Sequence, residues 1–233
     1  NILDAEGQVK IEDVVNNYLI KSEKLSYFRN INKIKTTGFT EANIQDEYQI
    51  DSKNLIYFLD KKKLSSQTKS TIKDNNNQIY YLDEFVYYVD TNLLKGKKVL
   101  LITNYNLPKS DRFFFSDGIF DLKTKKFTAS DTKINIHNNI FNEEKNDPRI
   151  YGVSSKGTEN FTVINKGSFT SCQIREGCAP WSIKSEKIKH NRIKKQIEYK
   201  NATLKVYDIP VFYFPKFFHP DPTVKRQSGL LRP

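Results

Sequence analysis

The sequence predicts an all-β chain of long antiparallel strands, and three observations lead to that prediction. A segment of about 30 residues repeats along the chain, apolar residues within each copy stand two apart, and polar turn sequences separate the strands. Ile, Val, Phe, Tyr and Thr, which favour strands, are abundant in each copy. With 233 residues, of which 37% are hydrophobic and 28% charged, the chain can bury a core.

The repeat is clearest in three consecutive copies. Residues 20–28 align without a gap with residues 50–58 and 80–88, and looser copies begin near Gly118 and Ile183. Each copy has room for an outgoing and a returning strand of about 10 residues, joined by a polar turn. The chain is therefore predicted to be a meander of long antiparallel strands.

Within each copy the apolar phase shifts once. Three positions separate Ser22 from Leu25 and Ser52 from Leu55, an odd spacing that strict alternation forbids. A bulge or corner explains the shift, because a strand that bends there contributes its two halves to two opposing sheets. We therefore expect a β-jelly roll, or an open V-shaped antiparallel sandwich.

The chain is expected to consist of one domain, residues 1–208, followed by a different segment, residues 209–233. Residues 209–222 contain four of the eight prolines and five aromatic residues. Prolines at this density exclude a central strand, so we expect an extended linker whose rings either dock on another body or cover the end of the sandwich. No stretch reaches the ~20 apolar residues of a membrane-spanning helix. Because the chain has no Met and starts within an amphipathic run, we expect it to be a fragment.

The composition argues against catalysis. The histidines, His137, His190 and His219, have no metal-ligand spacing, and we expect each to be solvated. The nine glycines are dispersed and form no phosphate-binding loop. We therefore predict no catalytic residue, no metal and no cofactor. The net charge of +11 suits a polyanionic partner, although Lys along strands is usually a solvated face that protects sheet edges.

Two cysteines, Cys172 and Cys178, are separated by five residues that include Gly177. In an oxidising compartment they could close a short disulfide loop. Two unlinked thiols are the alternative, and a zinc site lacks further ligands.

Short motifs in the C-terminal third carry a family resemblance. They are GSFTSC (167–172), WSI (181–183), NA (201–202), IPVFYFP (209–215) and RQSGLLRP (226–233). In this order and spacing they resemble the LptD family of lipopolysaccharide (LPS) assembly proteins, also called the organic solvent tolerance or OstA family. The upstream repeats resemble the OstA-like repeat that this family shares with the LptA and LptC transport proteins.

The resemblance implies a jelly roll at the periplasmic face of the Gram-negative outer membrane. Such a domain receives LPS from an LptA-like bridge protein and passes it to an outer-membrane barrel that holds an LptE-like lipoprotein. Residues 228–231 resemble the entry to the first barrel strand, and the barrel itself is absent here. Cys172 matches a family cysteine that forms disulfides to the barrel, so such links and a local bridge to Cys178 are alternative expectations.

A lipid carrier suits the predicted sandwich. Each methylene buried in an apolar seam between the sheets contributes ~0.8 kcal/mol, and Lys at the mouth can meet phosphates. An edge strand near Val9, Lys10 and Ile11 is expected to pair with the bridge protein by β-augmentation. The candidate lipid-binding residues, for each of which plain core packing is an equal explanation, are Ile20, Leu25, Tyr27, Ile50, Leu55, Tyr57, Phe85, Tyr87, Phe120, Phe169, Ile183 and Ile188.

Two other functions stay open as alternatives. A basic nucleic-acid-binding module would stack bases on the repeated Tyr side chains and would bind single strands with a steep salt dependence. A purely structural β-repeat module would bind no apolar ligand. The ordered motifs favour LPS transport, and we expect no nucleic-acid partner.

Overall fold

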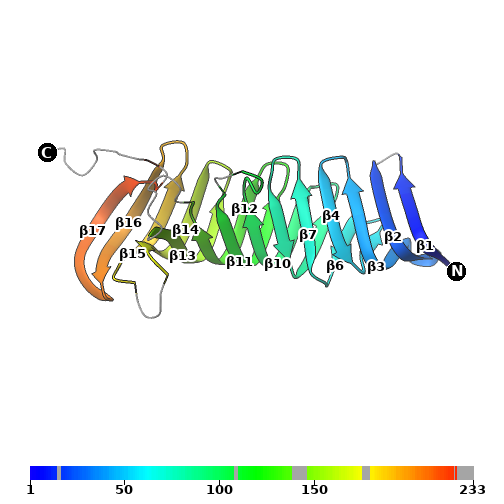
Figure 1. Cartoon of the computed structure of the whole chain (residues 1–233), viewed down its shortest axis with the longest axis horizontal. Helices are drawn as coiled ribbons and strands as arrows, with labels where there is room; N and C mark the ends of the chain where they lie inside the picture. Colours follow the sequence, from blue (N-terminus) through cyan, green and yellow to red (C-terminus); the bar gives the residue numbers. More distant parts are fainter. Residues whose placement is uncertain (15–16, 108–109, 138–145, 175–178, 223, 225–233) are drawn as a thin grey trace. The chain divides into compact units, whose positions relative to one another are not determined.

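A computed structural model describes residues 1–14, 17–107, 110–137, 146–174, 179–222 and 224. Over these residues the chain forms β-strands β1 to β17 and a single 3-10 turn, η1 (Arg29–Ile31) (Figure 1). The all-β prediction is confirmed. No helix in the described part of the chain has the length and hydropathy needed to cross a membrane.

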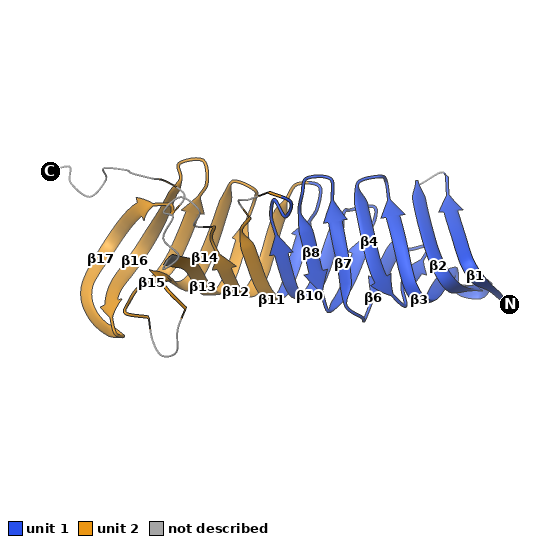
Figure 2. Cartoon of the chain, in the orientation of Figure 1, with its two compact units in different colours: residues 1–106, 117–123 blue, residues 107–116, 124–233 orange. Residues whose placement is uncertain are grey.

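The chain divides into two compact units, coloured separately in Figure 2. Unit 1 consists of residues 1–106 and 117–123, and unit 2 of residues 107–116 and 124–233. Strand β11 (Arg112–Asp121) is divided between them. Unit 1 contains β1 (Ile2–Asp13), β2 (Tyr18–Phe28), β3 (Lys33–Ile44), β4 (Tyr48–Lys53), β5 (Ile56–Phe58), β6 (Lys63–Ser66), β7 (Ser70–Asp74), β8 (Ile79–Leu82), β9 (Glu84–Tyr88) and β10 (Leu93–Ile102). Unit 2 contains β12 (Lys126–Asn135), β13 (Asn146–Gly157), β14 (Phe161–Cys172), β15 (Trp181–Asn191), β16 (Gln196–Val206) and β17 (Ile209–Pro220).

Unit 1 is an antiparallel meander in which some long strands are broken into two halves. Strand β1 pairs with β2, and β2 pairs with β3. Strand β3 then pairs with both β4 and β5, which together take the place of one long strand. The next two long strands are broken as well. Strand β4 pairs with β7 and β5 with β6, then β7 pairs with β8 and β6 with β9, and both β8 and β9 pair with β10.

Unit 2 repeats this order with unbroken strands. Each of β12 to β16 pairs antiparallel with the strand that follows it. Since residues opposite one another share a sheet face, the register aligns one apolar row across all six strands. That row consists of Ile134, Ile150, Phe169, Ile183, Leu204 and Phe212.

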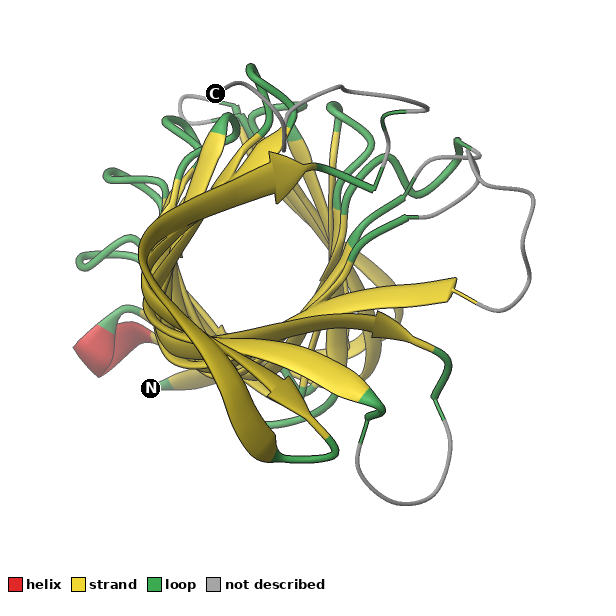
Figure 3. Cartoon of the chain, turned by 90° about the vertical axis from the view of Figure 1, so that its left-hand side faces the viewer, coloured by secondary structure: helices red, strands yellow, loops and turns green. Residues whose placement is uncertain are grey.

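The phase shifts expected from the sequence coincide with corners in the strands. The register of β2 against β3 slips between Ser22 and Lys24, opposite Gly38, whose φ of +85° is favourable only for glycine. At several corners two exposed residues separate two buried ones, as between Ser22 and Leu25 and between Ser52 and Leu55. The strands of both units therefore curve instead of running flat (Figure 3).

Buried hydroxyl groups satisfy the backbone where the corners interrupt the ladder. The Thr36 hydroxyl accepts a hydrogen bond from the Leu55 amide at 2.8 Å and another from the Thr40 hydroxyl at 2.8 Å. Ser52 and Ser70 bond to each other at 2.7 Å. A buried polar group without a partner would cost about 1–3 kcal/mol, so a small hydroxyl side chain suits these positions.

Residues 209–220, expected to be an extended linker, are extended and form strand β17, which pairs with β16 from Val206–Ile209 to Gln196–Pro220. Proline is compatible with this strand because an edge strand leaves one set of amide positions without a ladder partner. The remainder of the expected linker from residue 225 onward lies outside the described residues.

Candidate functional site

The interior face of the curved strands gathers the residues predicted from the apolar period. Eleven of the twelve candidates are buried, and Tyr27 is half-buried. Nine belong to unit 1, and Phe169, Ile183 and Ile188 belong to unit 2. The register aligns one row of them with other apolar residues across unit 1: Tyr27, Ile34, Tyr57, Leu64, Tyr87 and Leu94.

Aromatic pairs join the opposite ends of the curved strands in unit 1. The rings of Tyr18 and Tyr57 lie 6.2 Å apart, edge to face, and those of Tyr48 and Tyr87 lie 6.1 Å apart. A third pair, Tyr80 and Phe120, is separated by 5.6 Å. In each pair one ring comes from the start of one strand and the other from the end of another. The three pairs therefore form a line of ring contacts that closes the interior of unit 1. We call the line of three pairs the mouth.

Side chains leave little free space behind the Tyr18–Tyr57 pair of the mouth. A cavity of only ≈10 Å³, about the size of a single water, lies between the two halves of the strands. Its lining has no exposed polar surface and consists of Tyr18, Ile20, Ala42, Ile44, Tyr57, Leu64 and Val89. An alkyl chain could occupy this space only if the opposing halves moved apart.

The tyrosine hydroxyls at the mouth lie in an apolar environment. Burial raises the pKa of Tyr48 to about 12, with a smaller contribution from the carboxylates of Glu47, Asp74 and Asp121. Burial also raises the pKa of Tyr57 and Tyr87. These hydroxyls therefore stay neutral at any physiological pH, and the interior presents an uncharged surface.

In unit 2 an ion pair joins the ends of two strands, as the aromatic pairs do in unit 1. Asp111 precedes β11, Arg192 follows β15, and their side chains lie 4.0 Å apart. The Arg192 guanidinium lies 5.5 Å from the centre of the Phe113 ring and donates a hydrogen bond to the Thr162 hydroxyl at 3.0 Å. Burial lowers the pKa of Arg192, although the group stays charged because its ordinary pKa is so high.

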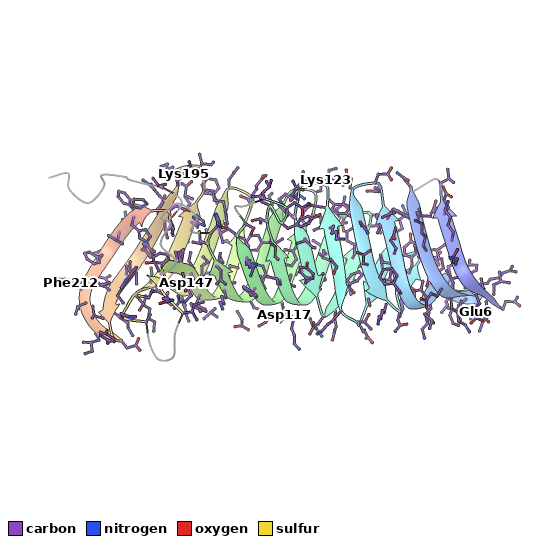
Figure 4. All side chains as sticks on the ribbon, viewed as in Figure 1. Glu6, Asp117, Lys123, Asp147, Lys195 and Phe212 are labelled. Atoms are coloured by element: carbon purple, nitrogen blue, oxygen red, sulfur yellow. The ribbon has the colours of Figure 1, made fainter. Side chains whose placement is uncertain are left out.

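The interior face of unit 2 becomes exposed at its last strand. Along the aligned row, Ile134 and Ile150 are fully buried, whereas Phe212 on β17 is 63% exposed (Figure 4). Phe212 continues into a ladder of rings, with Phe214 at 6.3 Å and Phe217 a further 5.3 Å away. Unit 2 therefore presents an aromatic strip on the same face that is buried elsewhere.

The histidines differ from the expectation of solvated side chains. His190 is 1% exposed, and its Nε2 pairs with Asp221, just beyond β17. His219 bonds through Nε2 to the Tyr199 hydroxyl at 2.7 Å, and burial lowers the pKa of His219. The expectation was wrong for His190 because residues 31 positions apart meet only when β17 pairs with β16. Within the described ranges, no group of three or more His, Cys, Asp or Glu is arranged to hold a metal.

The predicted disulfide lies in unit 2, and the predicted docking edge lies in unit 1. Cys172 is half-buried, and its sulfur lies 3.8 Å from the Trp181 carbonyl oxygen. Cys178 lies outside the described residues, so the pairing stays a prediction. Val9, Lys10 and Ile11 belong to β1, which pairs along one edge with β2 and is the first strand of unit 1 (Figure 1).

Sequence reasoning missed half of the mouth. Tyr57, Tyr87 and Phe120 were among the predicted residues, whereas their partners Tyr18, Tyr48 and Tyr80 were not. A signal for the partners was present, because Tyr18 and Tyr48 stand 30 positions apart, as do Tyr57 and Tyr87. The sequence could not show which two series meet, since that depends on how far the strands curve.

Comparison with known proteins supports the resemblance. No family model matches the chain. Over 81 residues, which are 35% of this chain, it is 37% identical to the LPS-assembly protein LptD of Escherichia coli K12, and the same values hold for LptD of Shigella flexneri serotype 5b. The chain spans about a tenth of the length of these relatives. The resemblance to LptD is thereby confirmed.

Proposed function

We propose that this chain is a non-enzymatic carrier domain for LPS assembly, and that it holds the acyl chains of LPS against its interior face. The similarity to LptD supports a role in LPS assembly, and the interior face supports the binding mode. Each unit offers a continuous row of apolar side chains without a charged group, and burial of methylenes against it is favourable at ~0.8 kcal/mol each. The twelve predicted residues are the proposed lipid contacts.

One observation carries the proposal: the interior face of unit 2 is uncovered at β17. Monomeric proteins rarely leave contiguous apolar surface exposed, and such patches mark contact sites for lipids or proteins. The strip of Phe212, Phe214 and Phe217 continues the buried row, so a lipid chain leaving the interior would stay against aromatic rings. We propose that this strip delivers the acyl chains to an outer-membrane barrel that follows in the full-length protein.

The proposal includes partners at both ends. The first strand, β1, leaves an edge near Val9, Lys10 and Ile11 with which a strand of an LptA-like bridge protein would pair by β-augmentation. An LptE-like lipoprotein would associate through the barrel, at the periplasmic face of the outer membrane. The segment 209–233 would lead into the first barrel strand.

Photo-crosslinking on β17 tests the proposal with a matched pair. Phe212 and Tyr213 are adjacent and almost equally exposed, at 63% and 61%, but they face opposite sides of the sheet. We would replace each in turn with p-benzoylphenylalanine, add LPS and irradiate. Because both side chains are exposed, neither replacement disturbs the core.

Capture of LPS at Phe212 and not at Tyr213 is the expected result. The same contrast is expected between the buried Tyr57 and its neighbour Ile56, which faces outward. Equal capture at both members of each pair would indicate non-specific adsorption. No capture at any position, together with tight salt-sensitive binding of single-stranded nucleic acid, would replace the proposal with the nucleic-acid alternative.

A further inference from the structure

The turns on one side of the mouth of unit 1 are acidic. The strand ends that supply Tyr18, Tyr48 and Tyr80 adjoin residues 13–14 and 17, 45–47 and 75–78. These residues, which we call the acidic lip, contain the carboxylates of Asp13, Asp46 and Glu47 and no Lys or Arg.

The turns on the other side are basic. The strand ends that supply Tyr57, Tyr87 and Phe120 are connected by residues 29–32, 59–62, 89–92 and 122–123, which we call the basic lip. These residues include the four cations Arg29, Lys61, Lys62 and Lys123, and two carboxylates, Asp60 and Asp90. A third carboxylate, Asp121, ends β11 directly before Leu122 and acts on the Tyr48 hydroxyl, so the cations outnumber the carboxylates on this side by one.

Three of the four cations of the basic lip are available to a ligand. Lys62 is paired with Asp90 at 2.9 Å. Arg29, Lys61 and Lys123 are exposed, and none has a carboxylate within 4 Å among the described residues of unit 1. Three unpaired charges therefore line one side of the mouth.

The two lips face each other across the aromatic pairs. Tyr18 on the acidic side contacts Tyr57 on the basic side, and the Tyr18 hydroxyl lies within reach of the charges of Lys62 and its partner Asp90 on the basic side and of Asp13 on the acidic side. The corners of the strands lie at the far edge: Figure 4 shows Lys123 at the upper edge of unit 1, and Glu6 and Asp117, both beside corners, at the lower edge. A molecule that parts the aromatic pairs would thus have positive charge on one flank and negative charge on the other.

We infer that unit 1 binds an anionic amphiphile in one fixed orientation, with its phosphate groups against the basic lip and its acyl chains in the interior behind the mouth. The inference rests on the proposed function and adds how the ligand is oriented. Phosphate is attracted by the unpaired cations and repelled by the carboxylates opposite. A ligand turned the other way would place its phosphates beside Asp46 and Glu47, so the lips act as an orientation filter.

Binding of lipid A to charge variants of the 233-residue chain tests the inference. The lip variant carries Arg29→Gln, Lys61→Gln and Lys123→Gln. A control variant carries Lys24→Gln, Lys53→Gln and Lys69→Gln, three exposed lysines near the corners, and has the same net charge. Affinity for diphosphoryl and monophosphoryl lipid A would be measured for both, alongside crosslinking from p-benzoylphenylalanine at Tyr57.

The lip variant is expected to bind diphosphoryl lipid A about tenfold more weakly than the control, and to lose most of its preference over the monophosphoryl form. Equal affinities of the two variants, with lipid still captured at Tyr57, would overturn the inference and leave the proposed function intact. Absence of capture at Tyr57 in the unmodified background would overturn the proposed function, and the inference with it.

Discussion

Three tyrosines at equivalent positions of unit 1 allow the energetics of the mouth to be measured. The Tyr87 side chain is 1% exposed, and its hydroxyl donates a hydrogen bond to Asn92 at 2.7 Å. Tyr27 makes the same bond to Asn32 at 2.9 Å but is half-buried. Tyr57 is 8% exposed, and the equivalent turn position is Lys62, so its hydroxyl makes no such bond in the described residues.

Replacement of each tyrosine by phenylalanine should therefore give different results. Tyr87→Phe is expected to lower the free energy of unfolding by about 1 kcal/mol, the net value of one hydrogen bond, and Tyr27→Phe by the same amount or less. Tyr57→Phe should be close to neutral, because the hydroxyl that it removes makes no hydrogen bond within the described residues.

Urea unfolding of the three variants and the parent, followed by circular dichroism, measures these differences. The slope of free energy against urea should be unchanged, since no variant alters the surface exposed on unfolding. A loss at Tyr57 equal to that at Tyr87 would refute the reasoning, because it would mean that the Asn92 bond contributes nothing specific.

Three further predictions concern the interior. Because the pKa of Tyr48 is raised from 10 to about 12, its own contribution to stability should be constant below pH 10 and should fall by about 2 kcal/mol as the pH rises through 12, and Tyr48→Phe should remove that part of the total alkaline fall in a urea–pH series. Asp221→Ala should cost about 1–3 kcal/mol in thermal or urea unfolding, because it leaves the buried Nε2 of His190 without its hydrogen-bond partner, and an unchanged midpoint would exclude a structural role for this pair. Gly167→Ala should cost about 1–3 kcal/mol, since the added Cβ would lie 2.7 Å from the Tyr151 carbonyl oxygen, and a neutral result would show that β13 and β14 can separate without cost.

Much of the strand architecture could be predicted from the sequence, because both the alternation and its interruption are local. The odd spacing of three positions between the buried residues Ser22 and Leu25 indicates a corner, whichever strand is the partner. The pairing of β17 could not be predicted, because proline excludes a central strand but not an edge strand. Whether residues 209–220 lie at an edge depends on the order of all the strands before them.

The candidate site was predictable in part for the same reason. Inward positions such as Tyr57 follow from the period of two within one strand. Contacts across the mouth, such as that of Tyr18 with Tyr57, depend on the combined angles of all the corners between the two residues. No local sequence pattern predicts that combined angle. The burial of His190 against Asp221 was missed for a related reason, since these residues stand 31 positions apart and meet only when β17 pairs with β16.

The free-energy cost of separating the two halves of the strands in unit 1 arises mainly at the mouth and not at the corners. The corner hydroxyls are bonded to each other and to backbone, so flexing there need not expose an unsatisfied group. Opening therefore mainly separates the three aromatic pairs, each worth about 0.5–1.5 kcal/mol beyond its buried area, and the rings would then contact the ligand instead of water. At ~0.8 kcal/mol for each buried methylene, about two to six methylenes offset that cost. Longer acyl chains would hold the mouth open, whereas a short-chain or fully polar ligand would leave it closed. Under the proposed function, the aromatic pairs would therefore select for an apolar ligand and the charged lips for its orientation.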